Sequence, residues 1–118
     1  MNNKVPIYGD RSRQSITADL KALREWVRQR QTNAPSGSGQ LRLVEDAGRM
    51  SFVLAMQDGA SASSGDMPIA RFQLSDGSWH LFWADRNGKW NLYDDRDYLT
   101  LAIPMVLVDQ DADGVFWR

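Results

Sequence analysis

The sequence predicts one α+β domain with an N-terminal helix, a largely antiparallel sheet of about five strands, a closing C-terminal helix and a short end strand. Three observations support this fold class. Apolar residues recur at helical spacing in residues 15–31, and from residue 41 the apolar period changes to two. The dipeptides Asp76-Gly77 and Asn87-Gly88 then separate three alternating segments, as hairpin turns do. At 118 residues, the chain is long enough to bury the core of one domain.

The first element is a helix over SITADLKALREWVRQRQ, residues 15–31. Its apolar stripe consists of Ile16, Leu20, Leu23 and Val27, widened by Trp26. We expect Ser15 or Thr17 to cap the start and Asp19 to lie in the first turn, where the helix dipole favours an anion. The residues before it, 1–14, are expected to form a flexible arm. The segment NAPSGSGQ, 33–40, ends the helix in a flexible loop.

Two strands follow, over residues 41–44 and 50–57, because apolar and other residues alternate there. Asp46-Ala47-Gly48-Arg49 between them is typical of a tight turn. The next segment, DGASASSGD at 58–66, is small and polar and is expected to be a mobile loop.

Three further strands are joined by Asp76-Gly77 and Asn87-Gly88, which both suit two-residue type I′ turns. Counting outward from these turns places Leu74 opposite Trp79 and Trp83 opposite Leu92. One face of the sheet then collects the predicted core residues Ala70, Phe72, Leu74, Trp79, Leu81, Trp83, Trp90 and Leu92. We expect the apolar stripe of the helix to cover this face.

The opposite face is predicted to mix polar and aromatic side chains. Its members are Ile69, Arg71, Gln73, His80, Phe82, Ala84, Asn91 and Tyr93. Two cross-strand rows are expected, Arg71-Phe82-Tyr93 and Gln73-His80-Asp95. A contiguous aromatic patch of this kind often marks a partner surface, although the segment KVPIY in the N-terminal arm or the loop 58–66 could instead cover it.

The last segment, TLAIPMVLVDQDADGVFWR, fits either a buried strand or a helix. Pro104 argues against a central strand but is tolerated in the first turn of a helix that Thr100 caps. In the helical interpretation Gly114 ends the acidic tail, and residues 115–117 form the short end strand.

The run WHLFWADRNGKWNLY, residues 79–93, resembles a Trp-x-x-Tyr-Trp…Lys-Trp-x-x-Tyr pattern of a bacterial domain-of-unknown-function family, number 3024. The matching positions are Trp79, Phe82, Trp83, Lys89, Trp90 and Tyr93. Residues 68–72 and 100–118 are similar to its Pro-x-Ala strand and to its closing helix with an Asp-x-Asp turn and a Phe-Trp end. Asn87-Gly88, Asn91-Leu92 and Arg118 depart from the family pattern. The resemblance implies an α+β fold with a closing helix, and it implies no activity.

The acidic tail DQDADG opens like a calcium-binding loop, with Asp109, Asp111, Asp113 and Gly114 at the first, third, fifth and sixth positions. The bidentate Glu that such a loop needs at its twelfth position is missing, because the given sequence ends at residue 118. We therefore predict a polar turn that ends a helix, with no metal site and no cofactor.

His80 is the sole histidine, and the predicted register places it opposite Asp95, as in the orienting half of a catalytic dyad. No nucleophile elbow, second base or phosphate-binding glycine loop accompanies the pair. We interpret it as an exposed cross-strand pair and do not expect an enzyme.

Charge separates the two candidate functions. Residues 1–42 hold eight of the 14 Lys and Arg residues but three of the 15 acids, and Lys21, Arg24 and Arg28 lie along one side of the helix. The chain as a whole lacks the basic excess of a nucleic-acid binder, since its net charge is −1. We expect a non-catalytic protein-binding or assembly module whose partner is another protein or a second copy. Its predicted contact residues are Arg71, His80, Phe82 and Tyr93. A nucleic-acid accessory factor using Lys21, Arg24, Arg28 and Arg71 is the alternative.

The composition of the sequence indicates the cellular compartment in which we expect the protein. The sequence has no cysteine, which suits a reducing compartment, and no apolar run approaches the ~20 residues that span a membrane. The N-terminal residues also lack the apolar region of a signal peptide. We therefore expect a cytoplasmic protein without membrane contact.

Overall fold

The computed structural model describes residues 13–33, 39–57 and 66–117, and it has the predicted α+β architecture. Along the chain, an N-terminal helix comes first, the five strands of one antiparallel sheet follow, and a C-terminal helix comes last. The elements are α1 (Arg13–Asn33), β1 (Gln40–Asp46), a 3-10 turn (Ala47–Arg49), β2 (Ser51–Gln57), β3 (Asp66–Ser75), β4 (Ser78–Ala84), β5 (Trp90–Leu92) and α2 (Ala102–Gln110). Most of the predicted arm and of the two predicted loops lies outside the described residues.

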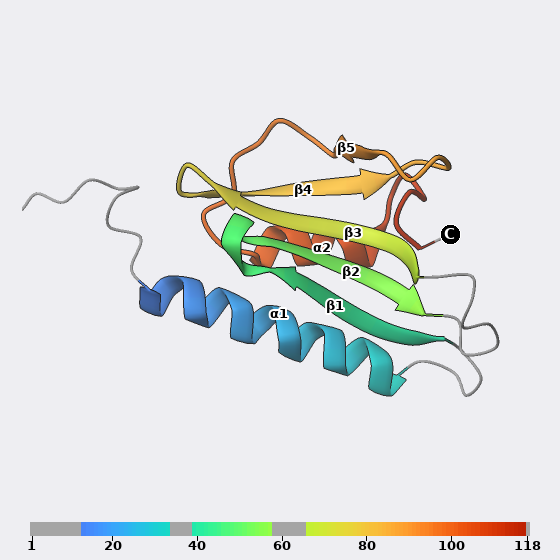
Figure 1. Cartoon of the computed structure of the whole chain (residues 1–118), viewed down its shortest axis with the longest axis horizontal. Coiled ribbons are helices and arrows are strands. Elements are labelled where there is room, and N and C mark those ends of the chain that lie inside the picture. Colours follow the sequence, from blue (N-terminus) through green and yellow to red (C-terminus); the bar gives the residue numbers. More distant parts are fainter. Residues whose placement is uncertain (1–12, 34–38, 58–65, 118) are drawn as a thin grey trace, which may run out of the picture.

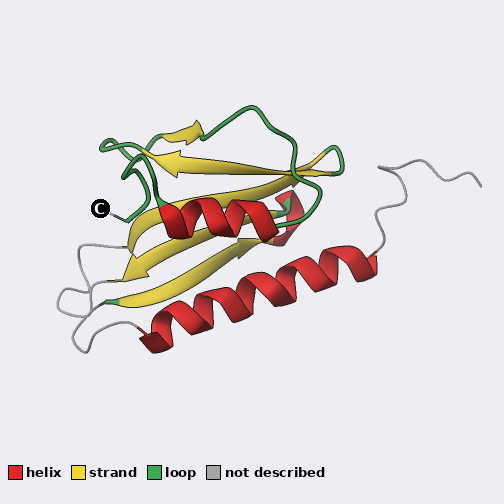
Figure 2. Ribbon diagram, turned by 180° about the vertical axis from the view of Figure 1, so that it is seen from behind, coloured by secondary structure: helices red, strands yellow, loops and turns green. Residues whose placement is uncertain are grey.

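The sheet is a meander in which each strand pairs with the next, in the order β1-β2-β3-β4-β5 (Figure 1). Both helices pack on one face: α2 lies over the sheet, roughly along its strands, and α1 runs beside β1 (Figure 2). The other face carries neither helix, and we call it the open face. None of the helices in the described residues is long and apolar enough to cross a membrane.

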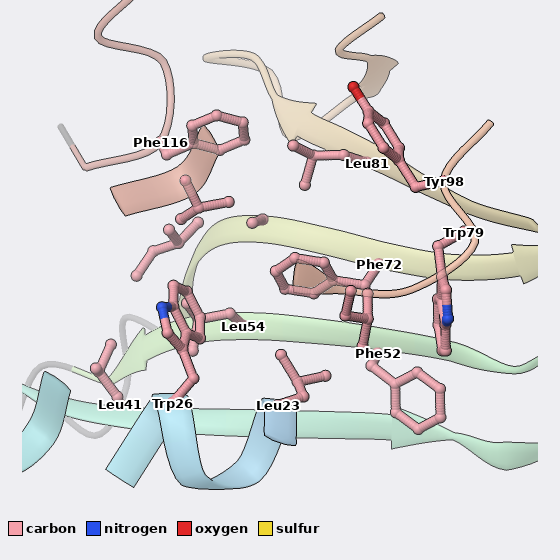
Figure 3. Close-up of a cluster of buried hydrophobic side chains, with 14 residues drawn as sticks. Leu23, Trp26, Leu41, Phe52, Leu54, Phe72, Trp79, Leu81, Tyr98 and Phe116 are labelled. Atoms are coloured by element: carbon pink, nitrogen blue, oxygen red, sulfur yellow. The ribbon is translucent and has the colours of Figure 1, made fainter. Parts of the chain in front are cut away.

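The core lies between the helices and the covered face of the sheet (Figure 3). From α1 it takes Leu23 and Trp26, and from α2 it takes Val108. The ring of Trp26 meets that of Phe72 edge to face, with 6.1 Å between centroids. The predicted apolar stripe of the helix therefore does cover the predicted sheet face, although Ile16, Leu20 and Val27 are only partly buried.

The start of α1 differs from the prediction. The helix begins at Arg13, so Ser15 and Thr17 lie within it and cannot cap it. Asp19 falls after the first turn and is buried, with 8% of its surface exposed. Its carboxylate points into the domain instead of serving the helix dipole.

The first hairpin prediction is confirmed. Asp76 and Gly77 both have positive φ, at 54° and 80°, as a type I′ turn requires. Leu74 lies opposite Trp79 and Arg71 opposite Phe82. The core positions predicted on β3 and β4 are therefore correct.

The second hairpin prediction is wrong by one residue. The turn has three residues, 86–88, because the amide of Asp85 donates to the carbonyl of Lys89. The Asp85 carboxylate accepts hydrogen bonds from the amides of Asn87 and Lys89, each at 2.9 Å, and only Gly88 takes a positive φ. This arrangement is a type I turn followed by a left-handed glycine.

The extra residue reverses the side chains of β5. Trp83 lies opposite Asn91 instead of Leu92, because a shift of one residue exchanges the two faces of a strand. The prediction that Trp90 and Leu92 join the core is therefore wrong, and both lie on the open face. Leu92 is 47% exposed.

A bulge in β3 produces a second correction. Leu54 pairs with Ala70 and Ala55 with Pro68, so Ile69 is the extra residue. Such a bulge interrupts strict alternation. Ile69 is consequently 1% exposed and part of the core cluster, although alternation had placed it on the opposite face.

The closing segment is a helix, as the resemblance implied. Pro104 occupies the third position of α2 and is buried. The predicted Thr100 cap is wrong, because Leu101 is the N-cap residue and no side chain caps the helix, although the Thr100 hydroxyl accepts a hydrogen bond from the amide of Ala102 at 3.3 Å. The predicted end strand is absent, because residues 115–117 pair with no strand in the described part of the chain.

Candidate functional site

The open face carries a row of side chains that crosses all five strands. Register pairs Val44 with Val53, Val53 with Arg71, Arg71 with Phe82 and Phe82 with Leu92. We call these five residues the central row. Strands lie ~4.8 Å apart, so four steps span about 19 Å. Most of the row is apolar, and its two ends, Val44 and Leu92, are 44% and 47% exposed.

A polar row lies beside the central row. Its members follow one another across four strands, with Asp46 opposite Ser51, Ser51 opposite Gln73 and Gln73 opposite His80. The predicted pairing of Gln73 with His80 is therefore correct. The open face thus joins one apolar stripe to one hydrogen-bonding stripe.

Arg71 stands at the centre of the face and links the two rows. Its guanidinium carbon lies 5.4 Å from the centroid of the Phe82 ring, a cation–π distance. Its Nε donates to Ser51 Oγ at 2.9 Å and its Nη2 to Gln73 Oε1 at 2.6 Å. These partners hold the guanidinium in place without neutralising it. Two of the predicted contact residues, Arg71 and Phe82, are thereby brought together.

Tyr93 is not part of this row, which corrects the predicted Arg71-Phe82-Tyr93 alignment. The three-residue turn places Leu92 opposite Phe82 and sends Tyr93 to the covered side of the sheet. There its ring centroid lies 5.2 Å from that of Phe116, and its hydroxyl donates to Asp113 Oδ2 at 2.8 Å. That hydrogen bond raises the pKa of Tyr93, with a further contribution from burial.

His80 lies on the open face but faces a different acid from the one predicted. Its Nδ1 is 3.7 Å from Asp97 Oδ1. Asp95 was predicted as the partner by counting from a two-residue turn, and the observed three-residue turn shifts that register. The pair lines a shallow pocket of about 350 Å³ with Ser75, Asp76 and Ser78. A separation of 3.7 Å is too long for a hydrogen bond, so the two interact as an ion pair when the imidazole is protonated.

The basic residues of α1 point away from the open face. Arg24 forms a forked ion pair with Glu45 of β1, with Nη2 2.9 Å from each carboxylate oxygen. Arg28 pairs with Glu25 one turn earlier, and Lys21 is exposed. The stripe of three cations predicted from the sequence is therefore largely compensated by carboxylates.

The three carboxylates of the acidic tail point to different donors. Asp109 accepts from the indole nitrogen of Trp26 at 3.0 Å and pairs with Arg30 of α1. Asp113 accepts from the Tyr93 hydroxyl. Among the described residues there is no group of three acidic, histidine or cysteine side chains that could hold a metal ion.

Asp111 organises the terminal segment that had been predicted as a strand. It ends α2 in the left-handed conformation, with φ 42° and ψ 51°. Its carboxylate accepts hydrogen bonds from the amides of Val115, Phe116 and Trp117 at 2.8, 3.0 and 3.0 Å. One side chain thus satisfies three backbone donors that a strand partner would otherwise have to satisfy.

Sequence reasoning missed a second exposed apolar group, made of Leu99 in the segment before α2 and of Ile103 and Val106 on α2. Leu99, Ile103 and Val106 are 61%, 55% and 49% exposed and recur at helical spacing. The sequence left this segment open as either a buried strand or a helix, and did not assign an exposed side to it. In the helix Leu101, Pro104 and Val108 are buried and Met105 and Leu107 are partly buried against the core, so the helical period of the segment separates a core side from an exposed side.

Comparison with known proteins identifies a family without an assigned function. The family model described as a domain of unknown function, DUF3024, matches residues 12–118. The comparisons with curated proteins and with solved structures found no match.

Proposed function

The chain belongs to the DUF3024 family, and because the function of that family is unknown, we propose a function from the geometry of the open face. The protein is a non-catalytic protein-binding or assembly module, and the central row is its contact surface. The expected setting, the bacterial cytoplasm, is part of this proposal, and the absence of cysteine is compatible with a reducing compartment.

The observation that carries the proposal is the composition of the central row. Val44, Val53, Phe82 and Leu92 form one apolar stripe across the sheet, and Arg71 interrupts it at the centre. Aromatic residues and arginine are enriched where proteins contact each other, and the energetic centre of an interface combines them in this way.

A binding role is better supported than catalysis by the surroundings of His80. In the described part of the chain, the polar contact of its side chain is with Asp97, a residue that is 70% exposed. A general base is oriented by a hydrogen bond from a third group. Asp97 lies at 3.7 Å and is mostly exposed, so it does not fix the imidazole in this way, and the pair is better suited to a polar rim of the contact surface.

The alternative function, a nucleic-acid accessory factor, has weaker support. It requires Lys21, Arg24 and Arg28 to act as free cations, whereas Arg24 and Arg28 already pair with Glu45 and Glu25. Phosphate binding would have to break these pairs. This alternative function predicts that the affinity of the protein for nucleic acid falls steeply as the salt concentration rises.

Affinity capture with matched variants tests the proposal. The tagged protein, its Phe82→Ala variant and its Ile103→Ala variant are used to capture proteins from the native cell, and each captured protein is then purified and titrated. A partner of the open face binds the wild type and the Ile103→Ala variant equally, and loses at least roughly 10-fold in affinity for Phe82→Ala. Thermal unfolding of each variant checks that it is folded.

The control separates the two exposed apolar surfaces, because Ile103 lies on α2 and is 55% exposed. Equal binding of Phe82→Ala and wild type by every purified partner would refute the use of the open face. Loss of binding in an Arg28→Gln variant together with steep salt dependence would instead favour nucleic acid.

A further inference from the structure

We propose that the partner of the open face is an acidic protein segment that places an Asp or Glu carboxylate on Arg71, between apolar side chains that pack on Phe82 and Val53. This inference rests on the proposed function, since it specifies the chemistry of the partner for the same surface.

The first argument is the charge of Arg71. It is half-buried, and its contacts in the described part of the chain are a hydroxyl, an amide oxygen and an aromatic ring. No described carboxylate lies within ion-pair distance of it. By contrast, Arg24, Arg28 and Arg30 each pair with an acid. Arg71 is therefore a fixed cation whose charge is not compensated by the described part of its own chain.

The second argument is the number of hydrogen-bond donors that remain. A guanidinium has five N–H groups. Ser51 and Gln73 take one from Nε and one from Nη2, so three remain on Nη1 and Nη2. A carboxylate accepts two parallel hydrogen bonds from two such nitrogens, and this forked geometry is the strongest pairing that arginine makes. The internal partners of Arg71 hold it in an orientation suited to that contact before any ligand arrives.

The third argument is the apolar surroundings. On either side of Arg71 in the central row lie Val53 and Phe82, and beyond them the exposed Val44 and Leu92. A partner that covers the row removes Arg71 from water, and an arginine buried without a counter-ion is costly. The apolar contacts of the row can therefore contribute to affinity only if the same partner supplies an anion at the centre.

The same geometry disfavours two other occupants. A second copy packed face to face about a two-fold axis through the centre of the row would bring the two Arg71 guanidiniums together, and like charges in an interface are repulsive. A nucleic acid would find one cation among aliphatic side chains, whereas phosphate backbones are bound by several cations in sequence. An acidic segment with aliphatic flanks matches both the charge and the stripe.

The test uses random peptides displayed on phage as the probe, selected on the full chain and titrated as synthetic peptides. We expect the selected sequences to be enriched in Asp or Glu flanked by aliphatic residues. Replacing that acid by Asn or Gln, or Arg71 by Gln, should each reduce affinity at least roughly 10-fold. The two changes combined should cost little more than either alone, because they remove the same contact.

Three variants make the outcomes distinguishable. Arg71→Lys keeps the positive charge but cannot form the two parallel hydrogen bonds. Its affinity for the peptides should therefore lie between those of the wild type and Arg71→Gln. Arg28→Gln removes a charge from α1, where the side chain is 68% exposed, and should leave binding unchanged. Phe82→Ala tests the open face itself. Unfolding measurements on Arg71→Gln and Arg71→Lys establish that any loss reflects the contact and not the fold.

Selected peptides that depend on Phe82 but tolerate Arg71→Gln would overturn the acidic partner and leave the proposed function standing. Peptides that tolerate both substitutions, or a selection without any peptide that depends on the open face, would overturn both. A dimer in sedimentation equilibrium that Phe82→Ala dissociates would identify a second copy as the occupant and refute this inference.

Discussion

The buried carboxylate of Asp19 on α1 accepts a hydrogen bond from the indole nitrogen of Trp79 on β4, at 2.9 Å. Its second oxygen lies 3.4 Å from the amide of Leu101, which precedes α2. One side chain therefore connects α1, strand β4 of the sheet and the residue before α2. A buried carboxylate is tolerated only when such donors replace water.

We expect Asp19→Ala to lower the free energy of unfolding by about 2–3 kcal/mol, because two buried donors lose their acceptor. Asp19→Asn keeps one acceptor oxygen and should cost less. Urea denaturation followed by tryptophan fluorescence measures both changes. Asp95→Ala, a change of an exposed acid, is the control and should be close to neutral. An equal effect of Asp19→Ala and Asp95→Ala would contradict the structural role of Asp19.

The Asp111 carboxylate should be needed to hold the terminal segment on the domain. In Asp111→Ala the amides of Val115, Phe116 and Trp117 lose their acceptor, so they should exchange with solvent at least roughly 10-fold faster. Hydrogen exchange followed by NMR resolves these positions. Gln110→Ala, at the exposed neighbour, should leave their exchange rates unchanged.

Two tyrosines should titrate abnormally. Burial and then the hydrogen bond to Asp94 raise the pKa of Tyr98 to about 12, and the hydrogen bond to Asp113 raises that of Tyr93 from 10. Because both folded pKa values lie above the unfolded value, the stabilisation is fully present below pH 10 and is lost as pH rises through the folded values. An alkaline titration of phenolate absorbance, with Tyr98→Phe to assign the last transition, checks this order. A transition near pH 10 for Tyr98 would show that its hydroxyl is exposed.

The three-residue turn before β5 depends on the backbone of Gly88. Its φ of 79° disfavours residues with a Cβ, while no atom lies within 4 Å of where that Cβ would be. Gly88→Ala should therefore cost about 1 kcal/mol through backbone strain alone, and Gly88→Asn less. Gly48→Ala is the matched control, since its φ is not positive and its Cβ would meet Asp46 Oδ1 at 3.8 Å. Thermal unfolding compares the three variants.

The accuracy of the sequence-based predictions depended on local turn chemistry. Asp76-Gly77 forms the turn its residues favour, so counting from it located the pair Arg71 and Phe82 correctly. The same counting failed at Asn87-Gly88 because the Asp85 carboxylate stabilises a longer turn. That one residue moved Tyr93 from the open face to the core side.

Other features could not follow from a pattern because they depend on long-range packing. The bulge at Ile69 is fixed by pairing with β2, and the burial of Asp19 is fixed by a tryptophan 60 residues later. Periodicity identifies which side of an element is apolar, but it does not reveal which distant donor a polar side chain will meet. That no carboxylate of the described residues pairs with Arg71, on which the proposed partner chemistry depends, is visible only in three dimensions.

The meander has a consequence for the order in which the chain folds. Neighbouring strands are joined by the segment between them, whereas the bonds that dock α1 join residues separated by 60 and 83 positions. Closing short loops costs less entropy than closing long ones, so we expect the hairpins to form before the helices dock. During synthesis α1 leaves the ribosome before the sheet, yet the Asp109 partner of its Trp26 is made 83 residues later. The helix α1 is thus made before the strands but reaches its final position after them.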